Sequence, residues 1–217
     1  MKGLLVKDLR LLKPQKMTLI LLWFIGIFMM FTYDSASFTV GYIIFVTAML
    51  GISTLSYDSF NNGMPFLMTF PVSRSEYVAA KYIFFIVSEA VTAGLITIVC
   101  TLINEIALHR SVFNEVAMAA GIALMAAIIF MALTYPFLFK FGVEKGRIVM
   151  AIFCGGIFAF AYVLEKIESN VNMVSSIMTF LTSIALWQII ALSILAVGLI
   201  VSISMLISMR IVKKKEY

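Results

Sequence analysis

The chain alternates between long uncharged, largely apolar runs and short segments that hold almost all of its charges. Uncharged runs of 17, 23, 24 and 17 residues lie between Lys16 and Asp34, Asp34 and Asp58, Glu115 and Lys140, and Arg147 and Glu165. A transmembrane helix needs roughly 20 apolar residues, because the hydrocarbon core is about 30 Å thick and a helix rises about 1.5 Å per residue. The pattern therefore predicts an all-α integral membrane protein with six spans, at residues 17–33, 38–56, 80–104, 116–139, 148–164 and 184–209.

The last uncharged run, 41 residues between Glu168 and Arg210, is nearly long enough for two spans. Its first part, residues 169–182, is rich in Ser, Asn and Thr, which suits a short interfacial or re-entrant segment better than a lipid-facing helix. With six spans, the inner segments hold 14 Lys and Arg residues and the outer loops only Arg110 and Lys166. This bias predicts that both termini are cytoplasmic, whereas a seventh span would place Lys213–Lys215 outside.

The first 14 residues predict a separate amphipathic helix. Leu5, Leu9 and Leu12 recur at helical spacing among basic residues, and Pro14 ends the pattern. Such a helix suits the inner membrane surface, although a helix that serves only as an orientation signal is equally compatible. The basic start and apolar run also look like a signal peptide, but the long patterned basic region and the later spans favour its retention.

Composition agrees with a single transmembrane domain over residues 1–217 in the plasma membrane. The chain is 63% hydrophobic and 12% charged, whereas soluble domains are about one quarter charged. The net charge of +5 is interpreted as an orientation signal with some attraction to anionic inner-leaflet lipid, so no nucleic-acid partner is expected. Cys100 and Cys154 both fall within predicted spans, which favours buried thiols over a disulfide.

The segment 57–79 cannot cross the membrane, because Asn61-Asn62-Gly63 is a turn signal and Pro65 and Pro71 interrupt any long helix. It predicts a cytoplasmic loop that exposes a short apolar piece, Phe66–Phe70. Immediately afterwards, Ser73 and Glu76 have the spacing of a capping box at the start of the third span. The apolar piece is either a docking surface for a soluble partner or a loop packed against its own helices.

No catalytic or metal-binding motif is present, so the chain is not expected to be an enzyme or to bind a cofactor. It has no glycine-rich phosphate loop, and its single histidine, His109, has no second metal-type ligand nearby. Glu89 is the one charge well inside a predicted span. It either lines a substrate path or is a protonated or hydrogen-bonded glutamate between helices.

The loop resembles the hallmark of ABC-2 type permeases. Asp58, the run Phe66-Leu67-Met68-Thr69-Phe70-Pro71-Val72-Ser73-Arg74, and the following Lys81 are similar to that family's acidic residue, short apolar helix, Leu-Pro-Val-Ser-Arg run and Lys after span two. Phe70 stands where the family more often has Leu. The opening Met1–Leu9, the length and the six spans are also similar.

The resemblance implies a permease dimer, formed by two copies or with a related permease, in which each protomer docks a separate ATP-binding cassette ATPase. ATP and Mg²⁺ would bind that ATPase. Residues 62–70 would form the coupling helix, and the implied coupling site is Asn61, Asn62, Gly63, Met64, Phe66, Leu67, Met68, Thr69, Phe70 and Arg74. Segment 169–182 would match the family's outer re-entrant helices.

Short permeases of this kind are similar to exporters of amphipathic or antimicrobial peptides. The apolar interior also favours a hydrophobic or amphipathic cargo. Two alternatives stay open from the residues alone: an ion-coupled secondary carrier, which usually shows paired broken helices and several intramembrane charges, and a structural or sensory membrane subunit that transports nothing.

Overall fold

The computed structural model describes residues 2–33, 35–59, 67, 69, 73–107, 109–168 and 186–215. These residues form long helices joined by short turns, and the described part of the chain contains no strand. The helices are α1 (Lys2–Leu12), the short 3₁₀ turn η1 (Lys13–Gln15), α2 (Lys16–Tyr33), α3 (Ala36–Ser59), α5 (Arg74–Ala107), α6 (Phe113–Glu168) and α8 (Leu186–Lys214).

Five segments are long and apolar enough to cross a membrane: Gly3–Tyr33, Ala36–Asp58, Arg74–Ala107, Phe113–Phe141 and Ile190–Lys214. They contain or overlap five of the six predicted spans. The predicted fifth span, 148–164, lies in the second part of α6 and is not among them, so the six-span count stays a prediction. The predicted re-entrant segment, 169–182, lies outside the described residues.

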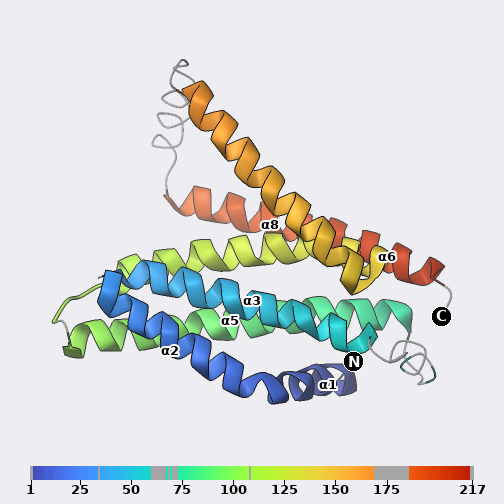
Figure 1. Ribbon diagram of the computed structural model, residues 1–217, viewed down its shortest axis with the longest axis horizontal. Coiled ribbons are helices and arrows are strands. Elements are labelled where there is room, and N and C mark those ends of the chain that lie inside the picture. Colours follow the sequence, from blue (N-terminus) through green and yellow to red (C-terminus); the bar gives the residue numbers. More distant parts are fainter. Residues whose placement is uncertain are drawn as a thin grey trace.

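The helices α2, α3, α5, α8 and the first part of α6 run lengthwise beside one another, and both termini lie at the same end (Figure 1). The helix α3 is central, since it packs against α1, α2, α5 and α6, while α8 packs against α5 and α6. Large apolar side chains such as Phe24, Ile98 and Leu195 are more than half exposed on the outside of this bundle. An apolar outer surface of this extent suits lipid rather than water.

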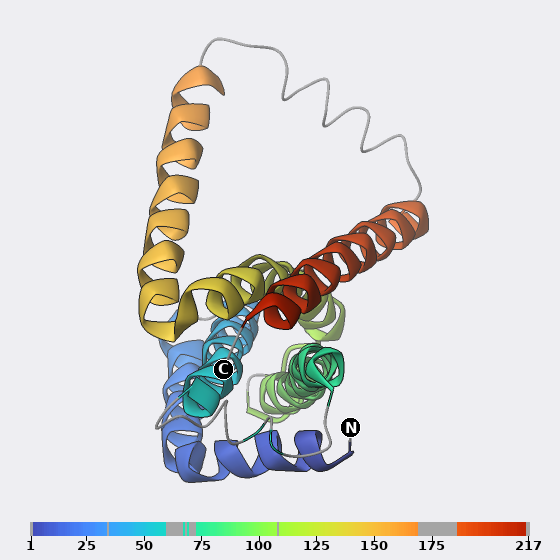
Figure 2. The same ribbon diagram turned by 90° about the vertical axis from the view of Figure 1, so that its right-hand side faces the viewer.

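The predicted fourth and fifth spans are joined with almost no loop. Helix α6 covers both and is interrupted at Gly142, whose φ of 79° and ψ of 172° lie in a region that is essentially restricted to glycine. The helix passes through Pro136 without such a break. Beyond Gly142 the chain turns away from the bundle and the second part of α6 rises out of it (Figure 2).

Helix α1 ends at Leu12, and Pro14 lies in the following 3₁₀ turn, as the sequence predicts. Leu4 and Asp8 are the buried residues of α1, whereas Leu9 is 68% exposed. The predicted apolar stripe at Leu9 therefore points away from the protein, and a charged residue points toward it. Placement of α1 on the inner membrane surface stays a prediction.

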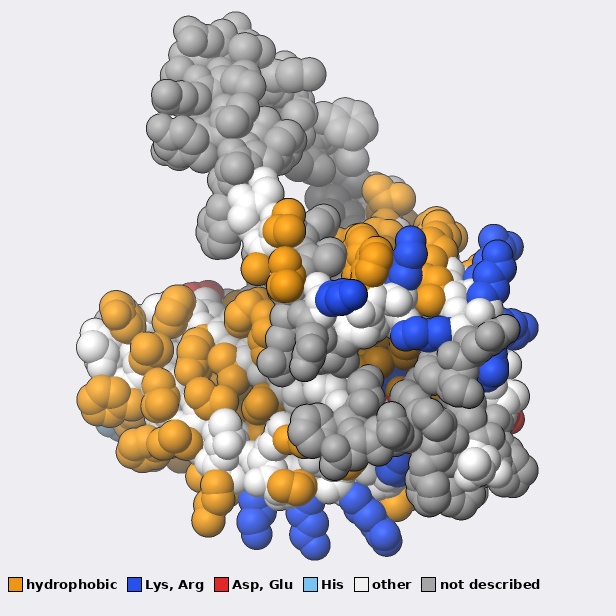
Figure 3. Space-filling model, turned by 45° about the vertical axis from the view of Figure 1, so that its right-hand side comes forward, with side chains coloured by type: hydrophobic (Ala, Val, Ile, Leu, Met, Phe, Trp, Pro, Cys, Tyr) orange, Lys and Arg blue, Asp and Glu red, His pale blue; other side chains and the backbone are white. Residues whose placement is uncertain are grey.

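Lys and Arg side chains gather toward the end of the bundle that holds the termini, while hydrophobic side chains cover the opposite end of the visible face (Figure 3). This separation agrees with the charge bias along the sequence. By the positive-inside rule the basic end is expected to face the cytoplasm.

Candidate functional site

Four charged side chains from three helices meet at the end of the bundle that holds the termini. The Lys81 ammonium group of α5 lies 2.7 Å from Asp8 Oδ1 of α1 and 2.7 Å from Asp58 Oδ2 of α3. The Lys7 ammonium group lies 2.6 Å from Asp58 Oδ1 and 3.4 Å from Asp8 Oδ1. We call Lys7, Asp8, Asp58 and Lys81 the charge cluster.

The charge cluster is almost completely removed from solvent. The side chains of Lys81 and Asp8 are each 1% exposed, that of Asp58 is 5% exposed, and only Lys7 reaches the surface, at 28%. A buried charge costs several kcal/mol unless it is paired and hydrogen-bonded. Two positive and two negative groups in alternating contact meet that condition and leave the cluster neutral.

Neighbouring polar groups complete the hydrogen bonding of the cluster. The Tyr77 hydroxyl group donates to Asp58 Oδ2 at 2.9 Å, and the Lys81 ammonium group donates to the carbonyl and hydroxyl oxygens of Thr54, both at 3.4 Å. Both lysines also lie near the face of the Tyr77 ring, at 5.6 and 5.8 Å from its centre. The interlocking contacts hold α1, the end of α3 and the beginning of α5 together.

The cluster brackets the predicted coupling loop. Asp58 lies in the last turn of α3 just before it, and Tyr77 and Lys81 lie in the first turns of α5 just after it. Both ends of the loop are therefore fixed to each other and to α1. Asp58 and Lys81 belong to the motif on which the family resemblance rests, and their contact gives a physical reason for an acidic residue and a lysine at those positions.

Most residues of the implied coupling site lie outside the described residues: Asn61, Asn62, Gly63, Met64, Phe66, Met68 and Phe70. Of the others, Leu67 is half-buried and packs against the hydrophobic core, whereas Thr69 is exposed. Leu67 therefore contributes to packing within the chain, and Thr69 is accessible to a partner.

The predicted capping box is confirmed. The Ser73 backbone N–H donates to Glu76 Oε2 at 3.0 Å, and the Glu76 backbone N–H donates to the Ser73 hydroxyl oxygen at 3.1 Å. This reciprocal pair satisfies two of the backbone donors that a helix start leaves free. It gives α5 a defined beginning directly after the loop.

Arg74 lies within this cap and reaches the other end of the chain. Its guanidinium group donates to the carbonyl oxygens of Lys213 and Lys215, both at 2.8 Å, in the last turn of α8. The final carbonyls of a helix have no partner within the helix, and a cation is favourable beside them. The beginning of α5 is thereby tied to the end of α8 as well as to α1.

Glu89 lies between α3 and α5 and is 1% exposed. The Thr47 hydroxyl group of α3 donates to Glu89 Oε2 at 3.3 Å, and a side chain at Gly51 would approach the other carboxyl oxygen within 4.0 Å. A substrate could reach this carboxyl group only if α3 and α5 moved apart. The predicted role of Glu89 in a substrate path stays a prediction.

Glu89→Gln is expected to change ATP-driven transport, or the ATPase rate that reports it, more than it changes stability. The amide keeps the size of the side chain and can still accept the Thr47 hydrogen bond, so the loss of folding free energy should stay below about 1 kcal/mol. Thermal unfolding and ATPase rates of the purified complex measure the two effects, with the exposed Glu105→Gln as control. Loss of folded protein in proportion to activity would assign Glu89 to packing.

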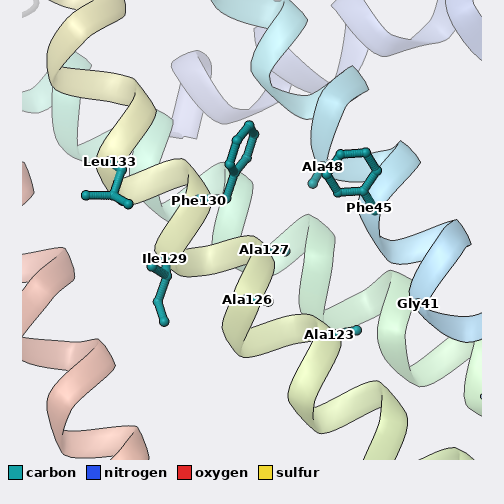
Figure 4. Close-up of a pocket in the computed structure, with 9 residues that line it drawn as sticks. All are labelled: Gly41, Phe45, Ala48, Ala123, Ala126, Ala127, Ile129, Phe130 and Leu133. Atoms are coloured by element: carbon teal, nitrogen blue, oxygen red, sulfur yellow. The ribbon is translucent and has the colours of Figure 1, made fainter. Parts of the chain in front are cut away.

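An apolar surface groove of about 490 Å³ lies between α3 and α6 (Figure 4). Phe45 and Phe130 border it, and several of its other lining residues are glycine or alanine. No lining residue carries a polar side chain, so the groove suits a lipid chain, an apolar cargo or a packed helix rather than a polar ligand.

The remaining candidates for chemistry are isolated. Among the described residues no three His, Cys, Asp or Glu side chains are grouped as metal ligands. His109 lies in the exposed turn after α5 with a φ of 51°, a conformation common where a helix ends. Cys100 is a buried free thiol, and nothing is described of the Cys154 side chain.

A family model described as "ABC-2 family transporter protein" matches residues 3–213, which is nearly the whole chain. Comparison with curated proteins and with solved structures gave no significant match. The matched range includes every helix that contributes to the charge cluster and to the Arg74 contact with α8.

Proposed function

The chain belongs to the ABC-2 transporter family, and we propose that it is the transmembrane permease subunit of an ATP-binding cassette exporter. It is a multi-pass protein of the plasma membrane. In this proposal two permeases pair, as two copies or as a copy with a related permease. A separate ATPase subunit binds ATP and Mg²⁺ and supplies the energy.

The observation that carries the proposal is the charge cluster at the base of the loop between α3 and α5. A force applied to a loop moves a helix bundle only if the ends of the loop are held firmly by the helices. Here Asp58 and Lys81, on the two sides of the loop, share one buried ion pair, and both bind α1 through Asp8 and Lys7. A displacement of the loop is therefore transmitted to α1, α3 and α5 together.

Movement of the loop also reaches the far end of the chain. Arg74 connects the start of α5 to the end of α8, and the Lys215 ammonium group donates to the Phe139 carbonyl oxygen of α6 at 3.1 Å. Closure of the ATPases on the loops would thus rotate α5 with α8 and the first part of α6. In the proposed mechanism this rotation opens a path toward the outside.

The proposed cargo is hydrophobic or amphipathic, with peptides as one such class. The groove between α3 and α6 has only apolar walls, and Glu89 is the one carboxyl group described in the middle of the bundle. Such surroundings favour a molecule that can leave water, and the scarcity of intramembrane charges speaks against coupling to an ion gradient.

Phe66→Asp is expected to release the ATPase while the permease stays folded. An aspartate in the apolar piece of the coupling loop would have to be desolvated on docking, at a cost of about 1–3 kcal/mol or more. The measurement is the ratio of ATPase to permease after affinity purification of the complex. Leu67 is avoided, because it packs against the core and its replacement would also destabilise the permease.

Phe113→Asp is the matched control, since it makes the same chemical change at a 55% exposed phenylalanine at the opposite end of the bundle. It should leave the ratio unchanged. Retention of the ATPase by the Phe66→Asp variant at the control's ratio would contradict the docking assignment. Ion-driven transport by the purified permease without any ATPase would support the secondary carrier instead.

A further inference from the structure

A second groove, of about 450 Å³, lies between α6 and α8. Its walls are apolar and include Leu133, Pro136 and Phe137 of α6, and Ile203 and Ile207 of α8. Ser204 also lines it, but its hydroxyl group already donates to the Ala132 carbonyl oxygen and is hydrogen-bonded to Tyr82. The body of this groove therefore offers nothing to a polar ligand.

The end of the α6–α8 groove nearest the termini is basic. Lys140 lines it, and Lys215 lies beside it because its ammonium group donates to the carbonyl oxygen of the preceding residue, Phe139. Exposed Arg210, Lys213 and Lys214 follow in the last turns of α8. The wall segments, residues 132–140 and 200–211, contain no acidic residue.

The length of the groove matches one leaflet of a bilayer. Its α8 wall runs from Ile200 to Ile211, which is about 16 Å along a helix at about 1.5 Å per residue. Half of a hydrocarbon core of about 30 Å is about 15 Å. A single acyl chain lying along the groove would thus place its headgroup at the basic end.

We propose that the α6–α8 groove binds one anionic phospholipid of the leaflet at the basic end of the protein. The acyl chain lies between α6 and α8, and the phosphate group binds the Lys140 ammonium group. Charge complementarity selects this occupant, because a zwitterionic headgroup gains little from a basic rim and an apolar helix would bring Lys140 no counter-charge. The site is independent of the proposed export function, since it needs neither ATPase nor cargo.

Quenching of a tryptophan by brominated lipid tests this site. The probe is Ile203→Trp, in a chain in which Trp23→Phe and Trp187→Phe remove the native tryptophans. The purified protein is reconstituted with brominated phosphatidylglycerol or brominated phosphatidylcholine at equal mole fraction. Ile83→Trp is the control: Ile83 is 43% exposed, and its neighbour Tyr82 contacts Ser204, so it has a similar depth outside the groove.

Phosphatidylglycerol should quench the Ile203→Trp probe with about fivefold higher apparent affinity than phosphatidylcholine, the preference expected from one lysine near an anionic headgroup. Lys140→Ala should abolish this preference and Lys140→Arg should keep it. Equal quenching by both lipids, or the same preference at the Ile83→Trp control, would overturn the proposal in favour of unspecific lipid contact. No quenching by either lipid would also overturn it, and would indicate that the chain itself or a second copy fills the groove.

Discussion

Lys81→Met should reduce the folding stability of the permease by about 3–5 kcal/mol, the usual cost of breaking a buried ion pair by removing one partner. Methionine retains much of the length of the side chain but leaves Asp8 and Asp58 with Lys7 as the remaining cation of the charge cluster. Lys7 is 28% exposed, so it cannot replace a lysine that is 1% exposed. The measurements are the yield of folded protein after detergent extraction and the midpoint of thermal unfolding.

A second substitution separates the effect of charge from that of packing. Adding Asp8→Asn to Lys81→Met removes one charge of each sign and leaves the Lys7–Asp58 pair, whose closest atoms are 2.6 Å apart. The double variant should therefore recover part of the lost stability, with a coupling energy of about 0.5–3 kcal/mol. Additive losses would show that Lys81 acts through packing alone.

Lys13→Met is the control for the loss of a lysine, because Lys13 is exposed in the turn after α1. It should leave the unfolding midpoint within experimental error of the wild type. If Lys81→Met unfolded at the same temperature as this control, the charge cluster would not stabilise the protein.

The sequence predicts those parts of the fold that depend on local patterns. Five of the six predicted spans coincide with long apolar helices, because a run of about 20 uncharged residues has few alternatives in a bilayer. The capping box at Ser73 and Glu76 is equally local, since its two partners are three residues apart. The end of α1 before Pro14 follows from the missing backbone donor of proline.

The charge cluster depends on contacts that the spacing of residues does not reveal. Lys81 and Asp8 are 73 positions apart, and Lys7 and Asp58 are 51 apart. In the sequence the two lysines contribute to the orientation bias, which treats every basic residue alike. One signal was available: Asp8 is an acidic residue on an otherwise basic helix, at i+4 from Leu4, so both lie on one face.

The contact of Arg74 with α8 was hidden for a related reason. The motif assigns Arg74 to the coupling loop, whereas the acceptors are backbone carbonyls 139 and 141 positions later, which any residue supplies. The break at Gly142 was also not expected, because glycine is common in membrane helices and only its backbone angles distinguish a hinge from a packing position.

Arg74→Gln should loosen the end of α8 and lower the folding free energy by about 1.5–3 kcal/mol, the usual contribution of hydrogen bonds to a charged group. Glutamine lacks both the charge and the fork of donors that serves the carbonyls of Lys213 and Lys215 together. Amide hydrogen exchange over residues 205–215 measures the local effect and should rise severalfold, with an intermediate rise for Arg74→Lys. The exposed Arg10→Gln of α1 controls for loss of a positive charge at the same end of the bundle. Unchanged exchange at the end of α8 in Arg74→Gln would separate α8 from the coupling loop, and the proposed transmission of loop movement to α8 would then lack its physical link.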